Sequence, residues 1–156
     1  MEAKSEALSI LEYELNAFKQ RVIENHIRAG QKASGRTISS LRVEITSDGG
    51  IVWGRKPFAT LETGRKGGKV PRGFYKIIYD WIIDKGLIFE KPKSVAYLIA
   101  RKIAREGTQL HRDGGRDDIY SKEIERMTEI IMEKVFGIFE RDVTHINLNS
   151  NEDRGI

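Results

Sequence analysis

Apolar side chains near the N-terminus recur at alternating intervals of three and four positions, which constrains this part of the chain to a helix with one buried face. The repeating residues are Leu8, Leu11, Leu15, Phe18 and Val22. We expect the helix to run from Ser5 to Ala29, with Gly30 as its stop. The run is too short for a sustained coiled coil, so we expect this helix to pack on a sheet.

The hydrophobic period changes from helical spacing to two after residue 40. Leu41, Val43 and Ile45 alternate with polar residues, as is typical of a strand with one face in solvent. Turn-forming residues occupy positions 47–50, and the apolar run Ile51–Trp53 follows. The two strands are predicted to form a hairpin, which needs the helix against it because one hairpin alone is marginally stable.

Two shorter helices are predicted in the second half of the chain. The first ends near Gly86 and carries Phe74, Ile77, Ile78, Trp81 and Ile82 at helical spacing. The second begins after Pro92, with Ser94 as its cap, and ends at Gly107. Its predicted buried stripe consists of Val95, Leu98, Ile99 and Ile103.

A longer helix is predicted from Ser121, which serves as its cap, to about Arg141. Its inward residues are expected to be Ile124, Met127, Ile131, Val135 and Ile138. Weak alternation over residues 143–148 predicts a last strand, and residues 149–156 are predicted to fray. The fold class is therefore α+β, with a long N-terminal helix and further helices packed on a small twisted antiparallel sheet. A length of 156 residues indicates one domain, residues 1–148, and makes two independent cores improbable.

Composition excludes several classes of protein. The chain has no cysteine, so disulfides, thiolate nucleophiles and cysteine-bound metal sites are excluded. The N-terminal sequence lacks the basic-then-apolar order of a secretory signal, and no apolar run approaches the roughly 20 residues that cross a bilayer. We therefore expect a soluble protein that does not contact membranes.

Positive charge is concentrated in residues 55–76. This segment has seven basic residues and one acidic residue, a balance of +6, whereas the whole chain carries +4. Its glycines and Pro71 disfavour regular structure, which predicts a mobile, exposed loop. The charge either contacts nucleic acid or an acidic protein surface, or serves only solubility.

No catalytic or metal-binding pattern stands out. His26, His111 and His145 lack metal-ligand spacing and are expected at the surface or at an interface. Three aspartates, Asp113, Asp117 and Asp118, lack the order of a calcium loop, and the sequence GRKGGK lacks that of a phosphate-binding loop. The sequence therefore predicts no enzyme, no cofactor and no metal.

The two tryptophans allow either core packing or base stacking. Trp81 shares its predicted helical stripe with Ile77, Ile78 and Ile82, which favours a place in the core. Packing is also favoured for Trp53.

The order of motifs between Ala29 and Tyr120 resembles that of the head–tail joining family of tailed bacteriophages, also called neck, tail-completion or minor tail components. The similarity is closest to versions from phages of gut bacteria. The motifs that carry it are Leu61-Glu62-x-Gly64-Arg65, Trp81 with Lys85-Gly86, and Ile99-Ala100-Arg101-Lys102-Ile103 followed by Gly107-Thr108.

This resemblance implies a structural virion protein, made in the host cytoplasm, that forms a ring of six or twelve copies around the DNA channel. The implied partners are copies of itself, portal-proximal adaptors, tail proteins and packaged DNA in non-specific contact. The longer C-terminal helix departs from shorter relatives and suits a neck ring. Candidate interface or DNA-channel residues are Arg55, Arg65, Lys66, Lys69 and Arg72. The alternative function is a small basic module that binds nucleic acid independently of sequence.

Overall fold

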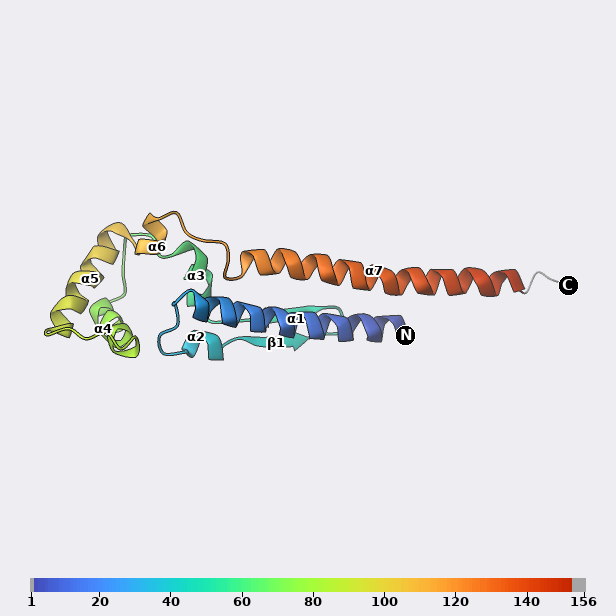
Figure 1. Cartoon of the computed structure of the whole chain (residues 1–156), viewed down its shortest axis with the longest axis horizontal. Helices are drawn as coiled ribbons and strands as arrows, with labels where there is room; N and C mark the ends of the chain where they lie inside the picture. The colour runs from blue at the N-terminus through green and yellow to red at the C-terminus, as the bar shows by residue number, and fades with distance from the viewer. Residues whose placement is uncertain (1, 153–156) are drawn as a thin grey trace.

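The computed structural model describes the backbone of residues 2–152 and the side chains of residues 2–146 (Figure 1). It is an α+β fold, as the sequence predicts, and its helices greatly outweigh one two-stranded sheet. None of the helices within the described part of the chain is long and apolar enough to cross a membrane. The elements are α1 (Glu2–Arg28), α2 (Arg36–Ser39), β1 (Arg42–Ile45), β2 (Gly50–Trp53), the 3₁₀ helix η1 (Lys56–Ala59), α3 (Thr60–Thr63), α4 (Phe74–Asp84), α5 (Pro92–Glu106), α6 (Gln109–Arg112) and α7 (Ser121–Glu152).

The predicted hairpin and the helix that supports it are both confirmed. β1 and β2 pair antiparallel, with Arg42 opposite Trp53 and Ile45 opposite Gly50. α1 packs along the hairpin, because the stripe read from its sequence turns Leu15, Phe18 and Val22 inward. The hairpin gains from α1 the apolar cover that two strands alone lack.

α7 runs antiparallel to α1 and extends past the N-terminus of that helix (Figure 1). A hydrophobic cluster joins the two helices and the hairpin, and its buried members are Phe18, Val22 and Ile119. Ion pairs tie the helices together at three levels: Arg21 Nε–Glu123 at 2.6 Å, Lys134 Nζ–Glu14 at 2.6 Å and Arg141 Nη2–Glu6 at 2.7 Å.

The predicted strand over residues 143–148 is wrong, because α7 continues through this segment to Glu152. Val143 and Ile146 extend a helical spacing that begins further upstream, and no proline or glycine lies between Gly137 and Glu152 to end the helix earlier. Residues 149–152 of the expected frayed tail are therefore helical, and residues 153–156 lie outside the described part.

α4 and α5 form a helical pair at the opposite end of the molecule from the last turns of α7 (Figure 1). They enclose a second hydrophobic cluster, made of Ile78, Ile82, Ala96 and Ala100. The buried apolar side chains of the described residues thus form two clusters, one around α1 and one between α4 and α5. Two alanines, a turn apart on α5, give α4 close access to its backbone.

Several expected inward residues on the later helices face solvent instead. Trp81 is 39% exposed, Leu98 is 67% exposed, and Ile77 and Ile124 are also exposed. Only α4 and α5 pack against each other here, so each helix buries a narrow stripe of side chains. The apolar side chains beside that stripe remain exposed to solvent. Ser94 does not cap α5, because the cap residue is Lys91 and Pro92 occupies the first turn.

Candidate functional site

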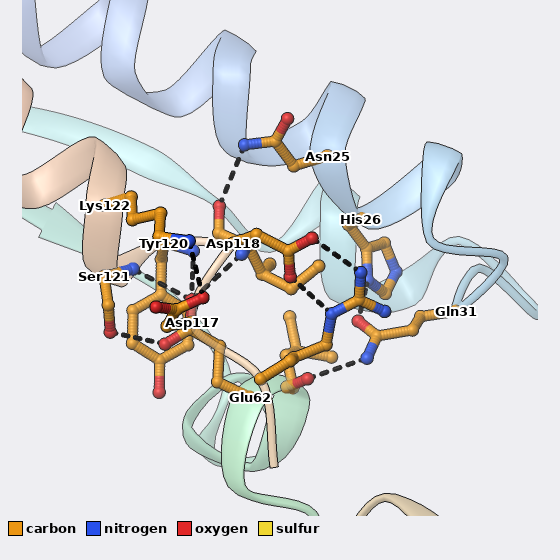
Figure 2. Close-up of polar contacts among 12 residues, drawn as sticks. Asn25, His26, Gln31, Glu62, Asp117, Asp118, Tyr120, Ser121 and Lys122 are labelled. Carbon is orange, nitrogen blue, oxygen red and sulfur yellow. Dashed lines mark hydrogen bonds and ion pairs between the residues drawn. The ribbon is translucent and has the colours of Figure 1, made fainter.

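A buried carboxylate, Glu62 of α3, joins the middle of the chain to the start of α7 (Figure 2). Glu62 is 3% exposed, and its Oε1 accepts the backbone N–H groups of Ile119, Tyr120 and Ser121 at 2.9, 2.7 and 2.9 Å. The Ser121 hydroxyl donates to Oε2. The expectation that Ser121 caps α7 is therefore wrong: the acceptor is Glu62, and its negative charge suits the positive end of the helix dipole.

The three aspartates of the 113–118 turn are engaged in local contacts. Asp118 receives two hydrogen bonds from Arg116, at 2.6 and 2.9 Å, and this guanidinium lowers the pKa of the Asp118 carboxyl. Asp117 pairs with Lys122 at 2.9 Å, and Asp113 accepts from Gln109 at 2.6 Å. Within the described residues, no group of three His, Asp or Glu side chains is arranged to hold a metal ion.

His26 is buried at the C-terminal end of α1, whereas the sequence placed it at the surface or an interface. Its Nδ1 lies 3.3 Å from the Gln31 side-chain oxygen, and the Gln31 amide donates to the Leu61 carbonyl at 2.7 Å (Figure 2). Burial lowers the pKa of His26, the Gln31 hydrogen bond opposes this shift, and the positive charge of Lys85 adds to it. The imidazole thus favours its neutral form in the folded chain.

We expect the folded chain to lose stability as the pH falls below about 6.5, the ordinary pKa of histidine. The His26 pKa is lower in the folded state, so the unfolded state binds more protons in this range and unfolding becomes more favourable. His26→Asn keeps an amide nitrogen near the place of Nδ1 but does not titrate. Urea unfolding at about pH 7.5 and about pH 5.5 should show a smaller pH effect in this variant, and an equal effect in both proteins would contradict the expectation.

The basic segment is more ordered than its glycine content predicts. Its first part forms η1 and α3. The residues that follow α3 are held by hydrogen bonds to the end of α5. The Arg65 N–H donates to the Thr108 hydroxyl at 2.9 Å, and the Arg65 carbonyl accepts from the Thr108 N–H at 2.8 Å. The Gly68 N–H donates to the Ala104 carbonyl at 2.7 Å. The expectation of an irregular loop throughout residues 55–76 is therefore wrong for residues 56–63.

The structure separates the five candidate cations into different environments. Arg65 is half-buried, stacks over the Phe74 ring at 5.3 Å and donates to the Lys69 carbonyl at 2.9 Å. It therefore helps to hold the loop in place. The others, Arg55, Lys66, Lys69 and Arg72, are exposed. Arg55 precedes η1 and borders a different hollow from the one that Arg65 lines.

A pocket of about 560 Å³ lies where α4, α5 and the loop after α3 meet, and we call it the α4–α5 pocket. Its lining is mostly apolar, with Trp81, Ile99 and Ile103 among the contributors. The cations that also line it are Arg65, Lys85, Lys102 and Arg112. Sequence reasoning missed this pocket, because its residues come from segments far apart in the chain. The resemblance motifs around Arg65, Trp81 and Ile99 were the available signal.

A second apolar surface lies on the side of α7 that faces away from α1. It consists of the α7 stripe, Met132, Phe136, Phe139, Val143 and Ile146, all of which are exposed. Phe136 alone is 69% exposed. A hollow runs along part of the stripe, with Met132, Phe136 and Phe139 among its walls. Sequence reasoning considered only the α1-facing positions of this helix and took its end for a strand.

The structure thus has two separate apolar surfaces, the α4–α5 pocket and the α7 stripe, and a hydrogen-bonded junction at Glu62. Comparisons with protein-family models, with curated proteins and with solved structures find no match to this chain.

Proposed function

We propose that this chain is a structural, non-catalytic subunit that assembles with its own copies into a ring at the head–tail junction of a tailed phage. The observation that carries the proposal is the uncovered α7 stripe. Large contiguous apolar surfaces are rare on soluble monomers and mark sites of protein contact. The resemblance of the motifs between Ala29 and Tyr120 to the head–tail joining family supplies the biological setting.

The distribution of surfaces also supports a ring. The α7 stripe lies along α7 from Met132 to Ile146, and the α4–α5 pocket is lined in part by α4 and α5. These helices extend toward opposite ends of the elongated molecule (Figure 1). A contact between two different patches is heterologous, and heterologous contacts close into rings when the rotation between subunits permits. The exposed loop cations would then meet the phosphates of DNA in the channel without reading its sequence.

Sedimentation velocity and electron microscopy of the purified chain test this function. We expect closed rings of one fixed copy number, with six and twelve as the numbers that the resemblance implies. A chain that remains monomeric and binds duplex DNA with strong salt dependence would instead support the alternative, a basic module that binds nucleic acid.

The exposed loop cations permit a separate prediction about DNA. Replacing Lys66, Lys69 and Arg72 with serine should leave ring formation intact and weaken duplex DNA binding. If each cation neutralises one phosphate, the slope of log affinity against log salt should fall by about 3. Arg65 is left in place because it supports the loop.

The matched control removes the same charge from other surfaces, with Lys4, Lys32 and Arg126 replaced by serine; all three are exposed. Fluorescence anisotropy with labelled duplex DNA, at several salt concentrations, measures the slopes. Equal slopes for the loop variant and the control would show that the loop is not the DNA contact.

A further inference from the structure

We propose that the α7 stripe of one copy docks into the α4–α5 pocket of the next copy, so that the subunits join head to tail. This inference rests on the ring function proposed above and names the two surfaces that would make each contact. It commits to a second copy of this chain as the occupant of both surfaces.

The α7 stripe has the spacing of a helix that packs on a partner. Its five residues are separated by four, three, four and three positions, which confines them to an arc of about 80° on an α-helix. The α1-facing residues, such as the buried Ile138, lie on another side of the helix. α7 therefore has two apolar faces, and α1 covers only one of them.

The charges beside the α7 stripe are acidic. Glu133 and Glu140 flank it on one side and Asp142 on the other, and all three are exposed. The nearby cations, Lys134 and Arg141, are paired with Glu14 and Glu6 of α1. The stripe thus presents an apolar strip with unneutralised carboxylates along its edges.

The α4–α5 pocket has the complementary chemistry. Its apolar walls suit aromatic side chains, and its volume falls in the range of roughly 300–1,000 Å³ that is typical of sites for small organic groups. Among its cations, Lys102 is exposed and offers a partner for a carboxylate. An aromatic side chain flanked by carboxylates fits both features.

The geometry and the charges favour this pairing over two other arrangements. α7 cannot fold back into its own pocket, because three ion pairs hold it along α1 and it points away from α4 and α5 (Figure 1). A contact between two α7 stripes would bring acidic flanks together, which opposes association. The α4–α5 pocket of another copy offers both apolar walls and positive charge.

Two variants with complementary defects test the docking. The stripe variant carries Phe136→Ser and Phe139→Ser, and the pocket variant carries Trp81→Ala and Lys102→Glu. All four positions are exposed, so both variants should fold, which circular dichroism and melting temperatures check. We expect each variant alone to self-associate at least about a hundredfold more weakly than the wild type.

The mixture of the two variants gives the decisive result. Each variant keeps one intact surface, so an equimolar mixture should form a 1:1 dimer in sedimentation velocity and nothing larger. A mixture that stays monomeric overturns the docking. A pocket variant that still self-associates like the wild type also overturns it, because the contact would then not use the pocket.

A charge control separates the effect of the flanking acidic residues on self-association from the effect of a change in net charge. Glu133→Lys with Glu140→Lys should weaken association, whereas Glu12→Lys with Glu24→Lys makes the same charge change at exposed positions of α1, away from the stripe, and should not. Equal weakening by the two pairs overturns the role of the acidic flanks in the docking.

The outcomes for this docking and for the ring function are distinguishable. Closed rings that persist in both surface variants overturn the docking and leave the ring function in place. Open head-to-tail chains that never close overturn the ring function and support the docking. A wild-type chain that remains monomeric up to about 1 mM overturns both.

Discussion

Replacing Glu62 with alanine should lower the free energy of unfolding by about 3 kcal/mol. The substitution removes the common acceptor of three backbone N–H groups at the start of α7, together with the partner of the Ser121 hydroxyl. These donors lie around a buried carboxylate, so water does not readily replace it. Hydrogen bonds to a charged group contribute about 1.5–3 kcal/mol, and donors left without an acceptor add to the loss.

Urea unfolding followed by circular dichroism measures this effect. Glu62→Gln keeps a carbonyl oxygen as acceptor and loses the charge, so we expect its loss to be about half that of Glu62→Ala. Glu125→Ala is the matched control, because Glu125 is an exposed glutamate near the start of the same helix, and its effect should stay within about 0.5 kcal/mol. A Glu62→Ala variant as stable as this control would show that the junction does not depend on the carboxylate.

The second large effect is expected at Gly107, where Gly107→Ala should cost about 3 kcal/mol. Gly107 has φ +84° and ψ 178°, a conformation that is essentially restricted to glycine. A Cβ there would also lie 2.6 Å from the Arg65 carbonyl oxygen and 3.0 Å from the Gly67 nitrogen. Backbone strain and a backbone clash therefore act together, and the loop must move away from α5.

Gly86→Ala is the matched control for strain without a clash. Gly86 has φ +68°, and a Cβ there would have nothing within 4 Å, so a cost of about 1 kcal/mol is expected. Release of the loop has its own readout, because trypsin should cleave after Lys66 and Lys69 faster in Gly107→Ala than in Gly86→Ala. Equal stability losses and equal cleavage rates would show that the hydrogen bonds between the loop and α5 do not contribute to the stability of the folded chain.

The predictions that held were those based on regular local patterns. The repeat from Leu8 to Val22 encodes α1, the alternation from Leu41 to Ile45 encodes β1, and Gly107 ends α5 as expected. Each of these patterns depends only on residues that are close together in the sequence. The strand predicted over residues 143–148 shows the weakness of this reasoning, because its few apolar residues fit a period of two only loosely, and Val143 and Ile146 belong to the α7 stripe.

The candidate surfaces depended on contacts that local patterns do not contain. Sequence reasoning singled out Arg65 as a DNA or interface cation but did not find the contacts by which its backbone and side chain hold the loop. It treated Trp81 as core, yet the two-helix thickness of the α4–α5 pair leaves this side chain half outside and at the pocket. The exposure of a side chain depends on the segments that pack over it. Because these segments are distant in the sequence, local patterns do not reveal them.

The sequence by itself determined the α+β class, the long first helix, the hairpin and the concentration of positive charge in residues 55–76. Only the tertiary structure decided that Glu62 caps a helix that starts 59 residues later, that the hydrophobic residues divide into two clusters, and that α7 keeps one apolar face uncovered. Periodicity specifies which residues share a face of an element. Which face meets which element is decided by the packing of the whole chain, because burial and long-range hydrogen bonds form only when distant segments come together.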